Sequence, residues 1–328
     1  MGALVKRLAG LPFETGARLR GWAYDRGLLP VRRVGLPVLS VGNLSVGGTG
    51  KTPLVIHLVE RLQARGRRPA VVARGYGRRP GEELNDEGRL LRRRFPDLPQ
   101  FQDPNRVAAA EEVARRGEAD LVILDDAFQH RRLHRDLDLV CLDATRPWHE
   151  DALLPGGRLR EPPSALARAD LLVLTRTEGL TAAARRRLAE RARCDAPGRP
   201  LLVSRHAPRD LLSPEGASLP LAGLRNRRVH LFAGIAAPAA FARSVEELGA
   251  RVAGLRVLPD HGAYTPRRLE GIARDFRASG AEWLLTTEKD LARAGSFPFP
   301  VHTLRIDLRI EAGEEQLEAA LDALEAGA

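Results

Sequence analysis

Residues 38–53 read VLSVGNLSVGGTGKTP, and they carry the strongest indication of the fold. A short, mostly apolar run leads into a glycine-rich turn, which is followed by Lys51-Thr52-Pro53. Glycines let backbone N–H groups approach phosphate oxygens, and proline is tolerated in the first turn of a helix. The stretch therefore predicts a buried strand, a phosphate-binding loop and a helix, as in P-loop nucleotide-binding proteins.

The loop also predicts which side chains meet the nucleotide. We expect Lys51 to reach the β- and γ-phosphates of ATP and the Thr52 hydroxyl to bind Mg²⁺. The loop residues expected to bind the cofactor around them are Gly47, Gly48, Thr49 and Gly50. The match is not strict, because Ser45 stands where the usual pattern has its first glycine. A glycine-rich turn without a ligand is the alternative interpretation, which the strand-to-helix context disfavours.

A second apolar run, Leu121–Leu124, ends in two carboxylates, Asp125 and Asp126. Parallel sheets bind ligands at the carboxyl ends of their strands, and Mg²⁺ prefers oxygen ligands. Taken alone, the acidic pair could equally cap a turn or a helix. Beside a phosphate loop, it predicts that Asp125 or Asp126 holds Mg²⁺ directly or through water.

The rest of the chain alternates apolar runs with helical patterns. Strands are expected at 37–41, 69–73, 121–124, 137–142, 171–174, 201–204, 229–233, 251–257, 283–286 and 301–306. Helices are expected at 52–65, 104–116, 181–193, 238–248, 266–278 and 314–325. This alternation predicts an α/β fold with a P-loop NTPase-like parallel sheet covered by helices, and a second, smaller α/β domain.

The domain boundaries follow from weak periodicity in residues 210–227, which contain Ser213-Pro214-Glu215-Gly216. We expect a basic amphipathic segment at 1–34, a P-loop nucleotide-binding domain at 35–210, and a smaller α/β domain at 211–328. The smaller domain is expected to close a cleft over the active site.

Composition narrows the possible partners. The 328 residues carry a net charge of +10, which favours anionic partners, but only 5% are aromatic and no nucleic-acid-binding motif is present. We therefore expect no nucleic-acid partner. Cys141 and Cys194 lie far apart, as in a protein of a reducing compartment. No apolar run is long enough to span a membrane, and no signal-peptide pattern is present, so a cytoplasmic protein is expected.

Several motifs, in this order, resemble the tetraacyldisaccharide 4'-kinase family, which phosphorylates the lipid A disaccharide precursor. The resemblance covers about residues 20–290. Besides Gly42-Asn43 and the loop, its motifs are Arg74-Gly75-Tyr76-Gly77, Asp86-Glu87, Asp125-Asp126 with Phe128-Gln129-His130, Leu154-Pro155 with Leu159-Arg160-Glu161-Pro162, Asp260-His261 with Tyr264, and Thr287-Glu288-Lys289-Asp290. Departures from the family pattern are Asn85, Gly88, Ala127 and Gly262, which concern loop geometry more than reacting side chains.

The resemblance implies a mechanism and a site. Asp86 matches the family's catalytic aspartate, and His261 is implied to orient it or the acceptor hydroxyl. Lys51 and Asp126 are expected to act in catalysis too. The residues implied to bind the cofactor beyond the loop are Asn43, Arg160 and Glu161. A surface ion pair is the alternative for the last two, and the chemistry of Thr287–Asp290 stays unassigned. By sequence alone Asp86 reads as a loop carboxylate.

The acceptor that the resemblance implies is a four-chain lipid, which stays in a bilayer. Residues 1–33 carry seven basic and two acidic side chains, interleaved with Leu4, Leu8, Leu11, Phe13, Leu19, Trp22 and Tyr24. This pattern predicts an amphipathic helix on an anionic membrane surface. An ordinary helix packed on the first domain is the alternative. We expect a monomer, peripheral on the cytoplasmic face of the inner membrane.

Two other functions stay open at this point. A P-loop ATPase of the partitioning or ligase class would act on a non-lipid partner, although Val46 replaces the extra lysine of that class. A nucleotide-dependent membrane adaptor without catalysis would tolerate the loss of Asp86 and His261.

Overall fold

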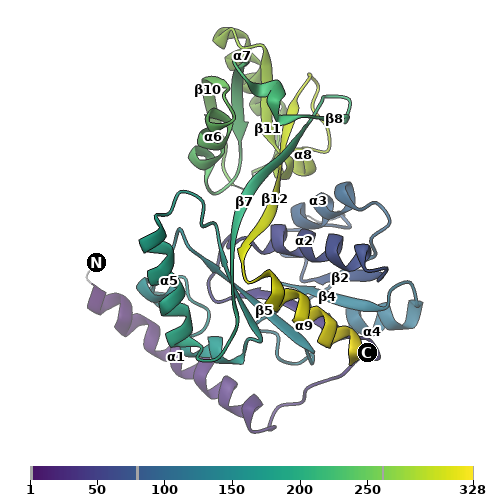
Figure 1. The fold of residues 1–328 in the computed structure, drawn as a ribbon, viewed down its shortest axis with the longest axis vertical. Helices are drawn as coiled ribbons and strands as arrows, with labels where there is room; N and C mark the ends of the chain where they lie inside the picture. The colour runs from purple at the N-terminus through teal and green to yellow at the C-terminus, as the bar shows by residue number, and fades with distance from the viewer. Residues whose placement is uncertain (1–2, 79–80, 261, 328) are drawn as a thin grey trace. The chain divides into compact units, whose positions relative to one another are not determined.

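The computed structural model describes residues 3–78, 81–260 and 262–327, with side chains from residue 13 onward (Figure 1). The chain forms two compact units, and each unit is built from segments that are not contiguous in the sequence. Unit 1 comprises the chain up to Gly75, Leu98–His206 and the chain from Leu308, and unit 2 comprises Tyr76–Asp97 and Ala207–Asp307. The ranges expected from the sequence were contiguous, whereas residues 76–97 and the C-terminal segment lie in the other unit. The cleft-closing role expected for 211–328 stays a prediction.

Unit 1 is built on a parallel sheet whose order is β7-β6-β5-β1-β4-β2-β3. Its strands are β1 (Val38–Asn43), β2 (Pro69–Ala73), β3 (Gln100–Gln102), β4 (Leu121–Asp125), β5 (Leu137–Asp143), β6 (Leu171–Thr175) and the start of β7 (Leu201–Leu212). Strand β1 is buried along its whole length and pairs with β4 and β5. Strands β2, β3 and β4 lie on one side of β1, whereas β5, β6 and β7 lie on the other. The strand order therefore reverses at β1, and such switch points are where open parallel sheets bind ligands, at the carboxyl ends of the strands.

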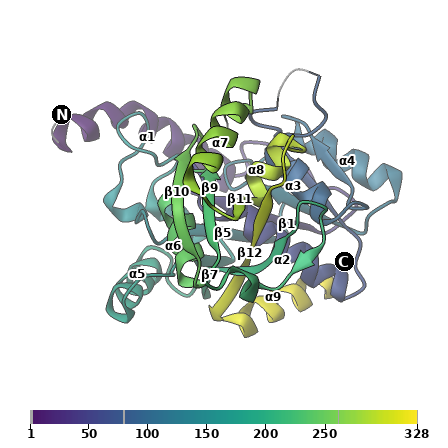
Figure 2. The same ribbon diagram turned by 90° about the horizontal axis from the view of Figure 1, so that it is seen from above.

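The helices of unit 1 include the C-terminal one. They are α1 (Ala3–Asp25), α2 (Lys51–Ala64), α4 (Arg106–Arg116), α5 (Ala182–Asp195) and α9 (Glu314–Ala326). Helix α9 lies beside α2 in both views (Figures 1 and 2), and Arg65, just after α2, forms ion pairs with Glu318 and Asp322 of α9. These pairs and the buried leucines of α9, such as Leu317 and Leu321, bring the end of the chain back to the first sheet.

The predicted amphipathic segment is helical, as α1. Near its C-terminal end Tyr24 is buried, with the Arg131 guanidinium 5.0 Å from the centre of its ring. Arg131 also donates a hydrogen bond of 3.0 Å to the Gly21 carbonyl oxygen. Leu19 and Trp22 are exposed. One end of α1 is therefore attached to unit 1 while apolar side chains of the same helix face solvent. Among the described residues, no helix is long and apolar enough to cross a membrane.

Unit 2 contains a shorter run of strands, with helices on both faces. Its strands are β9 (Arg228–Ala233), β10 (Arg251–Val257), β11 (Trp283–Thr287), most of β12 (His302–Ala312) and the end of β7, which pairs with β8 (Ser218–Leu219). Its helices are α3 (Asp86–Arg94), α6 (Pro238–Glu247), α7 (Pro266–Ser279) and α8 (Glu288–Ala294). Phe241 of α6 packs on the face that carries Leu231, and Ile272 of α7 packs on the face that carries Phe232. The α/β class expected for both parts of the chain is confirmed.

Helix α3 corrects the prediction of a loop around Asp86. Asn85 caps the helix, since its side chain accepts a hydrogen bond of 2.9 Å from the Gly88 amide. At the other end Arg94, only 3% exposed, donates hydrogen bonds of 2.8 and 2.7 Å to both carboxylate oxygens of Glu288. Helices α3 and α8 accordingly lie side by side in both views (Figures 1 and 2). The helix is fixed by contacts distant in sequence, which a local pattern does not show.

Candidate active site

The phosphate loop begins where β1 meets the segment after β4. A Cβ atom at Gly42 would lie only 2.4 Å from the Cβ of Phe128, so only glycine fits there. Asn43 is fully buried, and its amide donates hydrogen bonds to the Ser45 carbonyl oxygen (2.7 Å) and the Thr49 hydroxyl (2.8 Å). Asn43 therefore fixes the shape of the loop. That Asn43 also binds the cofactor stays a prediction.

The end of the loop is held by strand β6. Gly50 caps α2 with φ of 89°, a left-handed conformation that glycine adopts without strain. The Thr175 hydroxyl donates a hydrogen bond of 2.7 Å to the Thr49 carbonyl oxygen. Helix α2 starts at Lys51, directly after this turn. The loop therefore presents its backbone and the positive end of α2 at the carboxyl edge of the sheet, where phosphate would bind.

Lys51 and Arg160 meet at one carboxylate. The Nζ atom of Lys51 lies 3.3 Å from Asp126 Oδ1, and Arg160 Nη1 donates hydrogen bonds of 2.9 and 3.1 Å to the two oxygens of Asp126. Burial alone would raise the pKa of the Asp126 carboxyl, but the charges of Lys51 and Arg160 outweigh burial and lower it. Asp126 also has φ of 54°, an uncommon backbone conformation that often marks functional positions. The structure thus brings three predicted site residues together.

Arg160 reaches the loop because the segment that carries Arg160 forms backbone hydrogen bonds with the loop. The Arg160 amide donates to the Leu44 carbonyl oxygen at 2.7 Å, and the Val46 amide donates to the Arg158 carbonyl oxygen at 2.8 Å. The next residue, Glu161, instead accepts hydrogen bonds of 2.7 and 3.2 Å from Arg168. The structure therefore places Arg160 at the phosphate loop and Glu161 in an ion pair beside it.

The acidic strand end suits a divalent cation. Asp125 is the last residue of β4 and is buried opposite Val41, near the end of β1. Asp126 follows it, and Thr52 is the second residue of α2. Mg²⁺ in nucleotide sites is usually held by one or two carboxylates and a hydroxyl together with phosphate oxygens, rather than by a cage of protein ligands. The donor set fits that pattern, and no cluster of three or more His, Cys, Asp or Glu ligands occurs among the described residues.

Three charged or titratable side chains near the loop were missed by sequence reasoning. Arg106, at the start of α4, donates a hydrogen bond of 3.1 Å to the Asp126 carbonyl oxygen. Arg176 has φ of 58° and donates a hydrogen bond of 2.9 Å to Asp143. Its guanidinium lies near the loop, since a Cβ atom at Gly48 would be 3.6 Å from it. Both come from strand or helix ends that carry no motif of their own, so nothing in the local sequence marks them.

The third missed residue is His206, at the far side of the loop. A Cβ at Gly50 would lie 3.3 Å from its Nε2 atom, which is buried and makes no hydrogen bond to the described protein atoms. Burial, helped by the charge of Arg176, lowers the pKa of His206 to about 4. The imidazole is therefore neutral at physiological pH beside the loop that would receive phosphate.

Unit 2 holds the Asp86 carboxylate between two arginines. Arg89 donates a hydrogen bond of 2.7 Å to Asp86 Oδ1, and Arg293 Nε donates one of 3.0 Å to Oδ2. The Arg293 side chain is only 1% exposed and also donates to the Gly234 carbonyl oxygen at 2.8 Å. Asp86 is thus part of a buried network, and no sequence motif had marked Arg293.

The same network includes the motif Thr287–Asp290, whose role could not be assigned from the sequence. Asp290 is fully buried and accepts hydrogen bonds of 2.7 Å each from the Tyr264 and Thr287 hydroxyls, with Arg293 Nη1 at 3.4 Å from its Oδ1. Burial, reinforced by Asp290, raises the pKa of the Tyr264 hydroxyl above its usual range. Thr287 also caps α8, so the motif fixes the helix that carries Arg293.

The second predicted catalytic motif lies partly outside the described residues. Asp260 has Lys289 Nζ at 3.5 Å and Arg293 Nη2 at 4.0 Å. His261 is not among the described residues, so its predicted role stays a prediction. Tyr76, from the Arg74–Gly77 motif, is 83% exposed.

A loop of this kind, with its lysine held at an acidic strand end of a parallel sheet, defines the P-loop class of nucleotide-binding proteins. The model of the tetraacyldisaccharide-1-P 4'-kinase family matches residues 3–326, so the chain belongs to that family. The resemblance expected from the ordered motifs is confirmed, and the partitioning or ligase class is not favoured.

Individual relatives agree with the family. A tetraacyldisaccharide 4'-kinase of Anaeromyxobacter dehalogenans (strain 2CP-C) is 44% identical over 96% of this chain and 88% of its own length. Another, from Syntrophus aciditrophicus (strain SB), is 37% identical over 94% of this chain and 90% of its own. The crystal structure of LpxK from Aquifex aeolicus, described as an "apo" form in complex with ATP, matches with a TM-score of 0.77 and 29% identity over 96% of each chain.

Proposed function

We propose that this chain transfers the γ-phosphate of ATP to the 4'-hydroxyl of a tetraacyldisaccharide 1-phosphate. The observation that carries the proposal is the cluster of Lys51, Asp126 and Arg160 at the phosphate loop of a chain in this kinase family. The related LpxK whose structure contains ATP supports ATP as the donor.

In this proposal unit 1 holds the nucleotide. The loop amides and Lys51 would bind the β- and γ-phosphates, where fixed positive charge is most useful as negative charge shifts in the transition state. Thr52, Asp125 and Asp126 would hold Mg²⁺, which neutralises phosphate oxygens when bound. Arg160 and Lys51 already share Asp126, so phosphate binding would exchange one anionic partner of these cations for another.

Asp86 would accept the proton of the acceptor hydroxyl. A carboxylate can do so late in phosphoryl transfer, when the attacking oxygen is already bonding to phosphorus. Arg293 would act as a positioning residue, because it binds Asp86 Oδ2 and is itself fixed by Asp290 and the Gly234 carbonyl oxygen. His261 would orient Asp86 or the hydroxyl, as the family resemblance implies.

Helix α1 would bring the enzyme to its lipid acceptor, on the cytoplasmic face of the inner membrane. Leu19 is 62% exposed and Trp22 48% exposed, one helical turn apart on α1. Replacing both with serine should weaken binding to anionic vesicles about tenfold or more, because apolar side chains supply the insertion energy. Val31→Ser is the matched control, since Val31 is 46% exposed but lies outside the helix. Equal vesicle binding by all three proteins would refute the role of α1.

The proposal is tested by following labelled γ-phosphate from ATP and Mg²⁺ to tetraacyldisaccharide 1-phosphate in detergent micelles. The protein is taken from the monomeric fraction of a gel-filtration column. Label on the 4'-position that disappears with a chelator supports the reaction and the metal. ATP hydrolysis without a labelled lipid would favour an ATPase instead. ATP binding with neither product would favour a membrane adaptor.

A further inference from the structure

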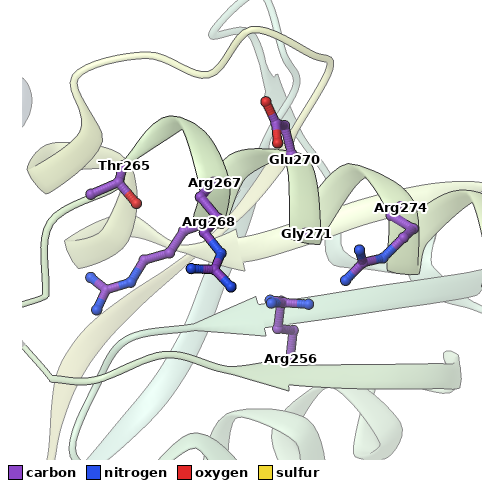
Figure 3. A pocket seen from close by; sticks show the side chains of 7 residues that line it. All are labelled: Arg256, Thr265, Arg267, Arg268, Glu270, Gly271 and Arg274. Carbon is purple, nitrogen blue, oxygen red and sulfur yellow. The ribbon is translucent and has the colours of Figure 1, made fainter.

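A cavity of about 550 Å³ opens in unit 2 between helix α7 and strand β10 (Figure 3). Four arginines and one acid line it, namely Arg256, Arg267, Arg268, Arg274 and Glu270. In Figure 3 the side chains of Arg267 and Arg274 extend from α7 toward the sheet, and Arg256 rises from β10 between them in this view. None of these residues takes part in the nucleotide loop or the Asp86 network described above.

The cavity carries more positive than negative charge. Arg256 is paired with Asp275, and Arg274 lies 3.8 Å from the same carboxylate. Arg268 donates a hydrogen bond of 2.6 Å to the Ala263 carbonyl oxygen, which leaves its charge unneutralised. Arg267 is exposed on α7. The four arginines therefore outnumber the two acids beside them, Glu270 and Asp275, and an anion in the cavity would relieve the excess positive charge.

Helix α7 is shaped to receive one of these guanidinium groups. Gly271 is buried inside the helix, where glycine is less favourable than alanine. A Cβ at this position would lie 2.6 Å from Nη2 and 2.8 Å from Cζ of Arg256. The glycine thus leaves room for Arg256 against the helix backbone. This close fit distinguishes the cavity from a chance gathering of exposed arginines on a basic protein.

The start of α7 adds to the positive electrostatic potential in the cavity. The helix begins at Pro266, and Thr265, which lines the cavity, makes no capping hydrogen bond with its hydroxyl. The first turn of a helix carries a partial positive charge and attracts anions. The hydroxyl, the helix start and the arginines would all favour a ligand rich in acceptor oxygens.

We propose that this cavity is a binding site for a phosphate monoester. Guanidinium groups match phosphate oxygens in planar, paired hydrogen bonds, which a carboxylate-poor cavity with several arginines can provide from more than one side. Cavities of about 300–1,000 Å³ hold small molecules, so there is room for a carrier group beside the phosphate. The carrier is a soluble metabolite or a lipid headgroup, and the two are separated by experiment.

Hydrogen–deuterium exchange read by mass spectrometry tests the site, because it reports α7 and β10 separately from the phosphate loop. The probes are inorganic phosphate, glucose 1-phosphate, and phosphatidylcholine vesicles with or without phosphatidic acid. Slower exchange in peptides covering 251–275 with either soluble probe supports a metabolite site. Slowing only with phosphatidic acid supports a headgroup site. No slowing in these peptides with any probe overturns the proposal.

Variants test whether the cavity binds the anion specifically. Gly271→Ala removes no charge but displaces Arg256, and we expect it to raise the apparent dissociation constant about tenfold. The double variant Arg267→Gln/Arg274→Gln changes only exposed side chains and should do the same. Arg277→Gln, exposed on the same helix but outside the cavity, is the matched control and should bind as wild type. If all variants lose affinity equally, or none does, binding is nonspecific attraction to a basic surface and the proposal is wrong.

Discussion

In the phosphate loop of unit 1, the residues that would meet the nucleotide come mostly from one continuous stretch, 42–52, shaped by glycine and by a buried asparagine. In unit 2, the Asp86 carboxylate is held by Arg293, 207 positions further along the chain. The loop is positioned by backbone geometry, whereas Asp86 is positioned by buried charge pairs. The two sites therefore depend on different kinds of stabilisation, and we expect them to respond differently to mutation.

The largest effect is expected in the loop. Lys51→Ala should lower the rate of phosphoryl transfer by about 10³-fold, because a fixed cation at the transferred phosphate is lost. The fold should survive, since Arg160 continues to neutralise Asp126. Transfer rates and the melting temperature are measured together. The control is Arg61→Ala, which removes a cation from the exposed side of the same helix. A Lys51→Ala protein with normal turnover would mean that the loop does not hold the reacting phosphate.

A smaller effect, on both turnover and stability, is expected from a change in unit 2. Arg293→Lys keeps the charge but cannot reach Asp86 and the Gly234 carbonyl oxygen together. Turnover should fall about tenfold with an unchanged KM for ATP, and the free energy of unfolding should fall by about 1–3 kcal/mol. Arg93→Lys, on the exposed side of α3, is the control. Lower stability with unchanged turnover would make Arg293 a structural residue only.

The smallest effect concerns pH and belongs to unit 1. The pKa of His206 is about 4 in the folded chain, below the ordinary value of 6.5, because of burial. The unfolded state therefore binds more protons between these values, so stability is lost as pH falls from about 6.5 toward 4. His206→Asn should reduce this loss by about 1–2 kcal/mol between pH 7 and pH 4.5. Urea unfolding at both pH values measures it. An identical loss in the variant would show that other groups cause the acid sensitivity.

The sequence predicted the loop and most of the strands because their signals are local. The strand expected at 251–257 is β10 without any shift, and the loop follows a fully buried strand as its apolar residues indicate. Helix α3 was not predicted, because only three of its nine residues are buried and its anchor is the pair between Arg94 and Glu288.

The network around Asp86 could not be predicted from the sequence for a related reason. A buried arginine has no local signature, since arginine is usually exposed and Arg293 is 1% exposed only because Asp86 and Asp290 neutralise it. The motif Thr287–Asp290 was visible in the sequence, but its purpose becomes clear only when Tyr264 and Arg293 are seen to converge on Asp290.

In the proposed reaction Asp86 serves the chemistry, while the loop serves the nucleotide. The most direct test is single-turnover transfer by Asp86→Asn, measured beside the dissociation constant for ATP, with Glu87→Gln from the same helical turn as control. We expect the transfer rate to fall by about 10²–10⁴-fold, with ATP binding unchanged and the control normal. A transfer rate equal to that of the wild type would show that Asp86 takes no part in the chemistry.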